Sequence, residues 1–240
     1  MKKIFIYTCL LCCSLPALIA AAGCHHNNNA AATQSPPPEA AAKTYTYLAL
    51  GDSYTIGQSI DSVGRYPAQA AALLDNDTGS IPAIQYIATT GWTTANLQNA
   101  INKARLTHTY DIVTILIGVN DQYQGVDTAT YHTRFVQLVQ TAILLAGGNR
   151  QHVIILSIPD YGMTPFGGGN AAISMQIDNF NRVNKRITDS FYLSYVDVTT
   201  LSRAAAGNPA LLASDGLHYS PEEYALWAQL LQPLITTALR

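Results

Sequence analysis

Two polar segments near opposite ends of the chain contain residue types that can cooperate in covalent catalysis. Residues 51–57 read GDSYTIG and place Ser53 just after an apolar run, and residues 215–218 read DGLH. An acid three positions before a histidine can hold one ring nitrogen and leave the other to take a proton from a serine hydroxyl. Taken separately, a serine after Gly-Asp is usually a helix cap, and a surface turn explains Asp215 and His218 equally well.

Two further segments offer neutral hydrogen-bond donors. Gly91 lies in TTGWTT (residues 89–94), and Asn120 lies in GVND (residues 118–121). A glycine lets its backbone N–H approach a ligand closely, and an asparagine side chain adds a second donor. Such donors stabilise the negative charge that develops during acyl transfer, although both residues also suit ordinary turns.

The order of predicted elements indicates how these segments come together. Five β-rich segments alternate with five helical ones, which predicts a parallel sheet covered by helices on both faces. Ligands of such sheets bind beyond the carboxyl ends of the strands, where we expect the four polar segments to meet. The predicted strands are 45–50, 81–88, 111–117, 152–158 and 193–198, and the predicted helices are 66–74, 94–106, 131–145, 171–190 and 221–239, the last capped by Ser220.

The segments GDSYTIGQ, GWTT, GVND and DGLH resemble, in order and spacing, the sequence blocks of the SGNH, or GDSL, hydrolase family. The resemblance runs from about residue 47 to beyond residue 218. It implies an α/β fold, namely a flavodoxin-like three-layer α/β/α sandwich with a five-stranded parallel sheet in the order 2-1-3-4-5. The α/β-hydrolase fold is disfavoured because it requires a Gly-x-Ser-x-Gly elbow, which the sequence lacks.

The same resemblance assigns roles to individual residues. Ser53 corresponds to the nucleophile, His218 to the general base and Asp215 to the partner that orients it. The backbone N–H groups of Ser53 and Gly91 and the side chain of Asn120 correspond to the oxyanion hole. For Asp52 and Asp121 we expect structural roles in holding their loops.

Aromatic residues near the motifs suggest a substrate-binding rim, although ordinary packing explains them equally well. They are Tyr54, Trp92, Tyr123, Tyr161, Phe166 and Tyr219, and the glycine-rich segment 159–169 is suited to form a lip over the site.

The leading substrates are short- or medium-chain acyl esters, including lysophospholipids. Alternatives are O-acetyl groups of a polysaccharide, or acyl transfer to an acceptor other than water. A non-catalytic binding lipoprotein is disfavoured because every key residue is present.

The N-terminus has the plan of an export signal. Two lysines precede an apolar run from residue 4 to 22, and AAGC at 21–24 resembles a lipobox in which Cys24 is acylated. Plain secretion and a membrane-spanning helix are the alternatives, and Pro16 counts against the second. We therefore predict a lipoprotein signal peptide (1–24), a disordered tether (25–43) and a hydrolase domain (44–240), anchored in the cell envelope, at the outer membrane in a Gram-negative cell.

Composition excludes several other classes of function. All four cysteines lie within the first 24 residues, so the domain has neither a disulfide framework nor a thiolate metal site. The formal net charge is −2, and no basic face suited to nucleic acid is apparent. We expect no metal and no cofactor, a small-molecule or glycan ester as substrate, and a membrane as partner only through Cys24. Oligomeric state is left open.

Overall fold

The computed structural model describes residues 43–74, 78–205 and 207–240. The predicted signal peptide, all but the last residue of the predicted tether, and the predicted lipidation site Cys24 lie outside these residues. Among the helices of the described part, none is long and apolar enough to cross a membrane.

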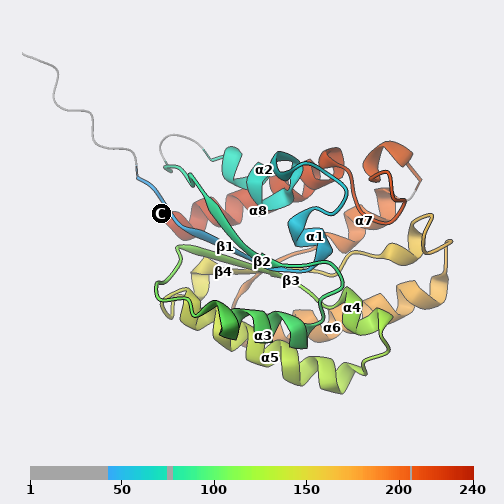
Figure 1. Cartoon of the computed structure of the whole chain (residues 1–240), viewed down its shortest axis with the longest axis horizontal. Helices are drawn as coiled ribbons and strands as arrows, with labels where there is room; N and C mark the ends of the chain where they lie inside the picture. Colours follow the sequence, from blue (N-terminus) through green and yellow to red (C-terminus); the bar gives the residue numbers. More distant parts are fainter. Residues whose placement is uncertain (1–42, 75–77, 206) are drawn as a thin grey trace, which may run out of the picture. The chain divides into compact units, whose positions relative to one another are not determined.

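A five-stranded, fully parallel sheet forms the centre of the domain (Figure 1). Its order is β2-β1-β3-β4-β5, which confirms the predicted topology. Every residue of β1, β3 and β4 is buried, in agreement with their nearly continuous apolar sequences. The strands are β1 Tyr47–Gly51, β2 Ile84–Ala88, β3 Ile112–Leu116, β4 Val153–Leu156 and β5 Ser194–Val196.

Helices cover both faces of this sheet (Figure 1). On one side α2 packs against α8, and on the other α5 packs against α3 and α6. All five predicted helices are confirmed, with ends that shift by up to three residues. The α-helices are α1 Ser53–Ile56, α2 Tyr66–Ala72, α3 Thr94–Ala104, α4 Val119–Tyr123, α5 Thr128–Leu145, α6 Ala171–Ser190, α7 Thr199–Ala205 and α8 Pro221–Leu239; the 3-10 turns are η1 Ser62–Gly64, η2 Arg150–His152, η3 Tyr161–Met163 and η4 Pro209–Leu211.

Side-chain caps determine where several helices begin. Thr93 and Asn96 form a reciprocal capping box at the start of α3. Asp127 accepts hydrogen bonds from two backbone N–H groups of α5, and Asn170 caps α6. Ser220 caps α8 as predicted, with its hydroxyl accepting from the backbone N–H of Glu223.

The register of the central strands brings three loops to one edge of the sheet. Gly51, the last residue of β1, pairs with Ala88 at the end of β2 and with Leu116 at the end of β3. The loops that follow these strands therefore start side by side. A side chain at position 51 would overlap the Thr55 hydroxyl and the Leu116 carbonyl, so the close approach of α1 to β3 requires glycine there.

Candidate active site

Ser53 is the first residue of α1, immediately beyond the carboxyl end of β1. The preceding residue, Asp52, caps this helix by accepting a hydrogen bond from the Tyr54 N–H at 3.0 Å. Because the first N–H groups of a helix have no partner within it, the Ser53 N–H is available at the sheet edge. The Ser53 side chain lies at the same edge, where little of the residue is exposed.

His218 and Asp215 form a close pair within one turn before α8. The ring Nδ1 of His218 lies 2.7 Å from Asp215 Oδ2, and the other carboxylate oxygen accepts from the backbone N–H groups of Leu217 and His218, both at 2.9 Å. This pairing occupies Nδ1 and leaves Nε2 for another partner. The Tyr54 ring, with its centroid 5.3 Å from that of the imidazole, packs beside it.

The Asp215 carboxylate is held in its charged form. Partial burial raises its pKa, but hydrogen bonds from Ser59, from His218 and from the Leu217 N–H more than offset that effect, and the net pKa lies below the usual range for aspartate. An ionised carboxylate beside Nδ1 stabilises a positive charge on the imidazole when the ring takes up a proton.

Ser53, Asn120 and His218 all line a single cavity of about 170 Å³. Four of the six aromatic residues predicted to form a substrate-binding rim also line it, namely Tyr54, Tyr123, Tyr161 and Phe166, whereas Trp92 and Tyr219 do not. Tyr219 is completely buried and packs against Trp227 instead.

Two further lining residues, Val119 and Leu217, were not predicted from the sequence. Each is adjacent to a predicted site residue, and this adjacency is the only sequence signal that could have found them.

Gly91 lies beside this group, on an exposed turn, rather than in the lining of the cavity. Its φ of +81° is a backbone conformation that glycine adopts readily. Asn120 donates from Nδ2 to the Trp92 carbonyl at 3.0 Å, and Gln124 donates to the Gly91 carbonyl at 3.3 Å. The glycine turn is thereby tied to α4, and Asn120 Nδ2 keeps a second hydrogen for a ligand.

Asp52 has the anchoring contact expected of it and an unusual charge state. The residue is completely buried, and only one carboxylate oxygen has a hydrogen-bond partner in the described part of the chain. Burial raises the pKa of Asp52 to about 8; the hydrogen bond from Tyr54 lowers it, and the neighbouring charge of Asp121 raises it again. Asp52 is therefore largely protonated at neutral pH.

Three aromatic rings form the rim of the cavity. The centroid of Tyr123 lies 6.1 Å from that of Tyr161 and 6.5 Å from that of Phe166, and the remaining pair is 6.2 Å apart. Tyr161 is buried, whereas Tyr123 and Phe166 are 62% and 55% exposed. Two of these three rings, all of which line the cavity, are therefore accessible to a substrate from solvent.

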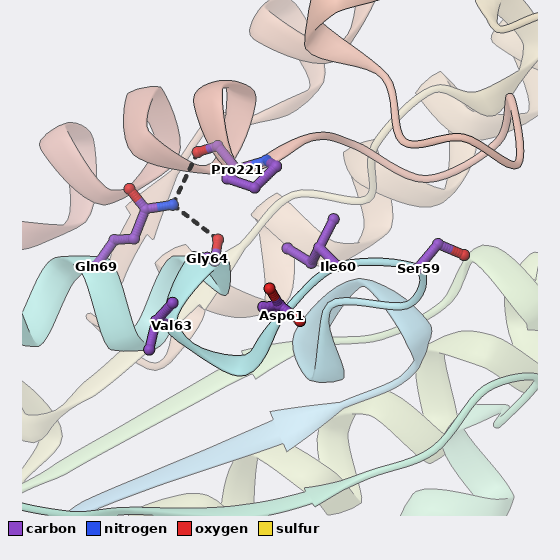
Figure 2. A pocket seen from close by; sticks show the side chains of 7 residues that line it. All are labelled: Ser59, Ile60, Asp61, Val63, Gly64, Gln69 and Pro221. Carbon is purple, nitrogen blue, oxygen red and sulfur yellow. Dashed lines mark hydrogen bonds between the residues drawn. The ribbon is translucent and has the colours of Figure 1, made fainter.

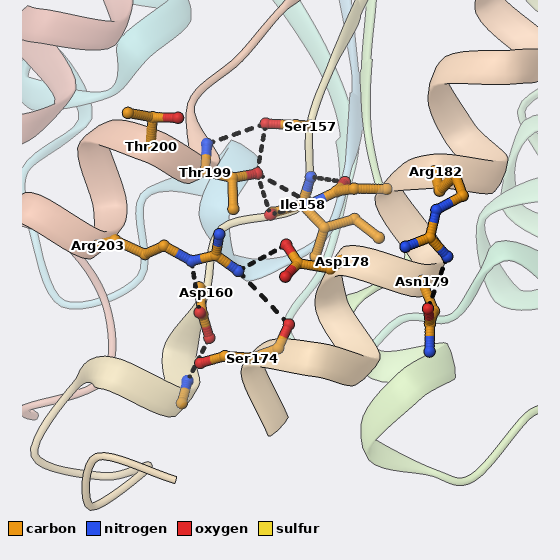
Figure 3. Close-up of polar contacts among 12 residues, drawn as sticks. Ser157, Ile158, Asp160, Ser174, Asp178, Asn179, Arg182, Thr199, Thr200 and Arg203 are labelled. Atoms are coloured by element: carbon orange, nitrogen blue, oxygen red, sulfur yellow. Dashed lines mark hydrogen bonds and ion pairs between the residues drawn. The ribbon is translucent and has the colours of Figure 1, made fainter. Parts of the chain in front are cut away.

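The loop that carries Tyr161 and Phe166 is fixed at its start (Figure 3). Asp160 accepts from the Arg203 Nε at 2.8 Å and from the Gly162 N–H at 2.9 Å. The Arg203 Nη2 reaches across to Asp178 at 2.7 Å, so that α7 holds both the loop and α6. The segment predicted to form a lip therefore starts from an anchored residue.

Within residues 43–74, 78–205 and 207–240, no cluster of histidine, cysteine and carboxylate side chains is suited to a metal ion.

One polar contact to the acid–base pair was not predicted: the Ser59 hydroxyl donates to Asp215 Oδ2 at 2.6 Å. Nothing in the sequence pointed to Ser59, because it lies 156 positions away from Asp215 in an ordinary loop.

Solved structures with the same fold include several hydrolases. Superposition on TesA gives a TM-score of 0.64 at 18% identity, covering 80% of this chain and 99% of TesA. A lipase/acylhydrolase from Enterococcus faecalis gives 0.64 at 21% identity, with coverage of 80% and 96%. Axe2, an acetylxylan esterase from Geobacillus stearothermophilus, gives 0.62 at 22% identity, with coverage of 80% and 94%.

Sequence comparison extends over the same region. A search of curated proteins gave no match. The model of the GDSL-like Lipase/Acylhydrolase family, in contrast, matches residues 49–226, which include all four motifs and both ends of the site described above. The chain is a member of the GDSL-like lipase/acylhydrolase, or SGNH, family of hydrolases.

Proposed function

We propose that this protein is a serine esterase that cleaves carboxylic esters through an acyl-enzyme. His218 takes the proton of the Ser53 hydroxyl as the oxygen attacks the ester carbonyl, and the alcohol leaves with a proton returned by the imidazole. Water, activated by His218, then releases the acid and restores Ser53. Asp215 keeps the ring in the required orientation and stabilises its positive charge.

The observation that carries this proposal is the shared cavity of Ser53 and His218. The imidazole is fixed through Nδ1 by Asp215 at 2.7 Å, and the ring and the serine line the same space of about 170 Å³. A hydroxyl at the start of a helix that shares a cavity with a histidine, whose Nε2 has no hydrogen-bond partner among the described residues, suits nucleophilic catalysis.

The oxyanion of the tetrahedral intermediate has three candidate donors in this arrangement. Ser53 supplies its N–H at the start of α1, Gly91 supplies an N–H from the turn after β2, and Asn120 supplies the second hydrogen of Nδ2. The contacts of Asn120 and Gln124 with residues 91 and 92 support a common orientation of these donors.

The size of the cavity favours a small acyl group. A space of about 150 Å³ holds a molecule the size of benzene, so a cavity of about 170 Å³ accepts an acyl group of roughly six heavy atoms or fewer. A longer chain would have to leave the cavity past Tyr123 and Phe166. We therefore favour short-chain esters over medium-chain esters and lysophospholipids.

Removal of O-acetyl groups from a polysaccharide is the second candidate. Acetate fits the small cavity, and the exposed rings of Tyr123 and Phe166 offer flat apolar faces on which a sugar ring can stack. Axe2, which has the same fold, is an acetylxylan esterase, and this supports the idea at the level of the fold alone.

A matched series of aryl esters tests the proposal. We expect kcat/KM to be highest for acetyl and butyryl esters and to fall for octanoyl and dodecanoyl esters.

Acetate release from acetylated xylan tests the second candidate, and a lysophospholipid tests the long-chain class. An added alcohol that takes the acyl group in place of water would indicate an acyltransferase. Hydrolysis that Ser53→Ala leaves intact would refute the proposal.

We further propose that the protein is exported and anchored to the cell envelope through Cys24. This proposal rests on the two lysines at positions 2 and 3, the apolar run from residue 4 to 22 and the AAGC sequence at 21–24. In cells fed an alkyne-tagged fatty acid, the wild-type chain should be labelled and Cys24→Ala should not. Equal labelling of both proteins would overturn this proposal.

A further inference from the structure

The segment that follows α1, residues 57–59, contacts three parts of the candidate active site. Its Gln58 backbone N–H donates to the Ser53 carbonyl at 3.0 Å. The Gln58 side chain accepts from the hydroxyl of Thr90, the residue before Gly91, at 2.6 Å. Ser59 then donates its hydroxyl to Asp215 Oδ2, also at 2.6 Å. One short segment thus links the loops that carry the serine, the glycine and the acid.

The contact of Ser59 is made to the oxygen that faces the imidazole. Asp215 Oδ1 is occupied by two backbone N–H groups of its own turn. Oδ2 accepts only from the His218 Nδ1 and from Ser59 within the described residues. Because the Asp215 side chain is 31% exposed, water can reach this carboxylate, and the Ser59 hydroxyl provides a fixed donor in its place.

The backbone of Ser59 lies in a conformation that residues with a Cβ rarely adopt. Its φ is +68°, in the left-handed region. The side chain lies at the end of an open surface pocket, and its hydroxyl points away from the other lining side chains (Figure 2). Glycine would adopt this backbone more easily, but it would remove the only side-chain donor to Oδ2 other than His218 in the described part of the chain.

We propose that Ser59 is a positioning residue for the Ser53–His218–Asp215 triad and acts through Asp215. Its hydroxyl fixes the carboxylate rotamer in which Oδ2 faces the His218 Nδ1. The inference rests on the proposed esterase function, because it concerns the acid of the same triad. Ser59 does not line the cavity of Ser53 and His218, so its loss should alter turnover rather than substrate binding.

Four variants assayed with an acetyl aryl ester test this role. Ser59→Ala and Ser59→Gly both remove the hydroxyl. The glycine also adopts the left-handed backbone conformation at this position without strain. Ser59→Asn tolerates the left-handed region and keeps a donor. Ser62→Ala is the matched control, because the exposed Ser62 hydroxyl makes no side-chain hydrogen bond within the described residues. Folding is checked by circular dichroism at the assay temperature.

We expect Ser59→Ala and Ser59→Gly to lower kcat about tenfold with KM within twofold of wild type, and to slow fluorophosphonate labelling by a similar factor. Ser59→Gly should unfold at a temperature no lower than that of Ser59→Ala. Ser59→Asn should recover part of the lost kcat, and Ser62→Ala should match wild type.

Wild-type kcat in Ser59→Gly would overturn the inference, because it would show that only the backbone matters. The inference would also be overturned if the hydroxyl-deleted variants kept the wild-type kcat and differed from wild type only in a higher KM. Ser53→Ala is measured alongside: if it is inactive while both hydroxyl-deleted variants are normal, the Ser59 role alone fails. If Ser53→Ala stays active, the esterase proposal fails.

Discussion

The carboxylate of Asp121 accepts two hydrogen bonds from Thr94, one from its backbone N–H at 2.8 Å and one from its hydroxyl at 2.6 Å. Both residues are completely buried. Thr94 begins α3, three residues after Gly91, and Asp121 directly follows Asn120 in α4. The contact therefore fixes the two loops that supply candidate oxyanion donors relative to each other.

Replacing Asp121 with alanine should weaken both the fold and the activity. The substitution leaves two buried donors of Thr94 without an acceptor, which costs about 2–4 kcal/mol of unfolding free energy. We also expect kcat to fall, because Asn120 and the glycine turn lose their common anchor. Urea unfolding and ester hydrolysis measure the two effects.

Asp127→Ala provides the control for Asp121. Asp127 makes similar bonds to two backbone N–H groups and a hydroxyl, but it is exposed and caps α5. Its loss should cost about 1 kcal/mol and leave kcat unchanged. If Asp121→Ala is as mild as Asp127→Ala, the anchoring role of Asp121 is wrong.

Asn120→Ala should reduce turnover while leaving the protein folded. Loss of one preorganised oxyanion donor typically lowers kcat by about 10²–10³. The change also removes a partly buried bond to the Trp92 carbonyl, so we expect a small decrease in melting temperature. Near-normal kcat in a folded Asn120→Ala protein would show that this side chain does not stabilise the transition state.

The buried carboxyl of Asp52 should make stability fall as pH rises. Its folded pKa of about 8 lies above the usual value of 3.8, so the folded state binds a proton that the unfolded state releases. This contribution is complete below pH 4 and is lost as pH rises towards 8, with a slope of at most about 1.4 kcal/mol per pH unit.

Asp52→Asn removes this titration while keeping an acceptor for the Tyr54 N–H. Unfolding free energies measured between pH 5 and pH 8 should therefore decline less steeply in the variant than in the wild type. Parallel curves for the two proteins would mean that Asp52 is ionised in the folded state throughout this range.

Phe166→Ala tests the aromatic rim. Loss of the exposed ring should raise KM about fivefold for an acetylated xylo-oligosaccharide, equivalent to ~1 kcal/mol of contact energy, with little change in kcat. Tyr192→Ala, which removes an 83% exposed ring that is not part of the cavity, should leave KM unchanged. An unchanged KM in Phe166→Ala would remove this ring from the binding surface.

The sequence was sufficient for the elements whose patterns are long or strongly apolar. The nearly continuous apolar runs at 111–117 and 152–158 predicted the buried strands β3 and β4, and the capped start at Ser220 predicted α8. The motifs also predicted which loops meet, because parallel strands bring their carboxyl ends to one edge. The short helices α4 and α7 were missed, since five to seven residues carry too little periodicity.

Contacts between distant loops could not be predicted in the same way. The hydroxyl of Ser59 contacts Asp215, and Arg203 of α7 contacts Asp160, only because the fold brings segments that are far apart in the sequence together. Trp92 was expected to line the cavity from its place beside Gly91. Its side chain packs against the core instead, and only its carbonyl contacts Asn120.

Fluorophosphonate labelling followed by peptide mass spectrometry tests the central claim most directly. The probe reacts with a serine only when a neighbouring base activates its hydroxyl. We predict a single modified peptide that carries the adduct on Ser53, with no labelling of Ser53→Ala and strongly slowed labelling of His218→Ala. An adduct on another residue, or unchanged labelling of the folded Ser53→Ala protein, would contradict the assignment.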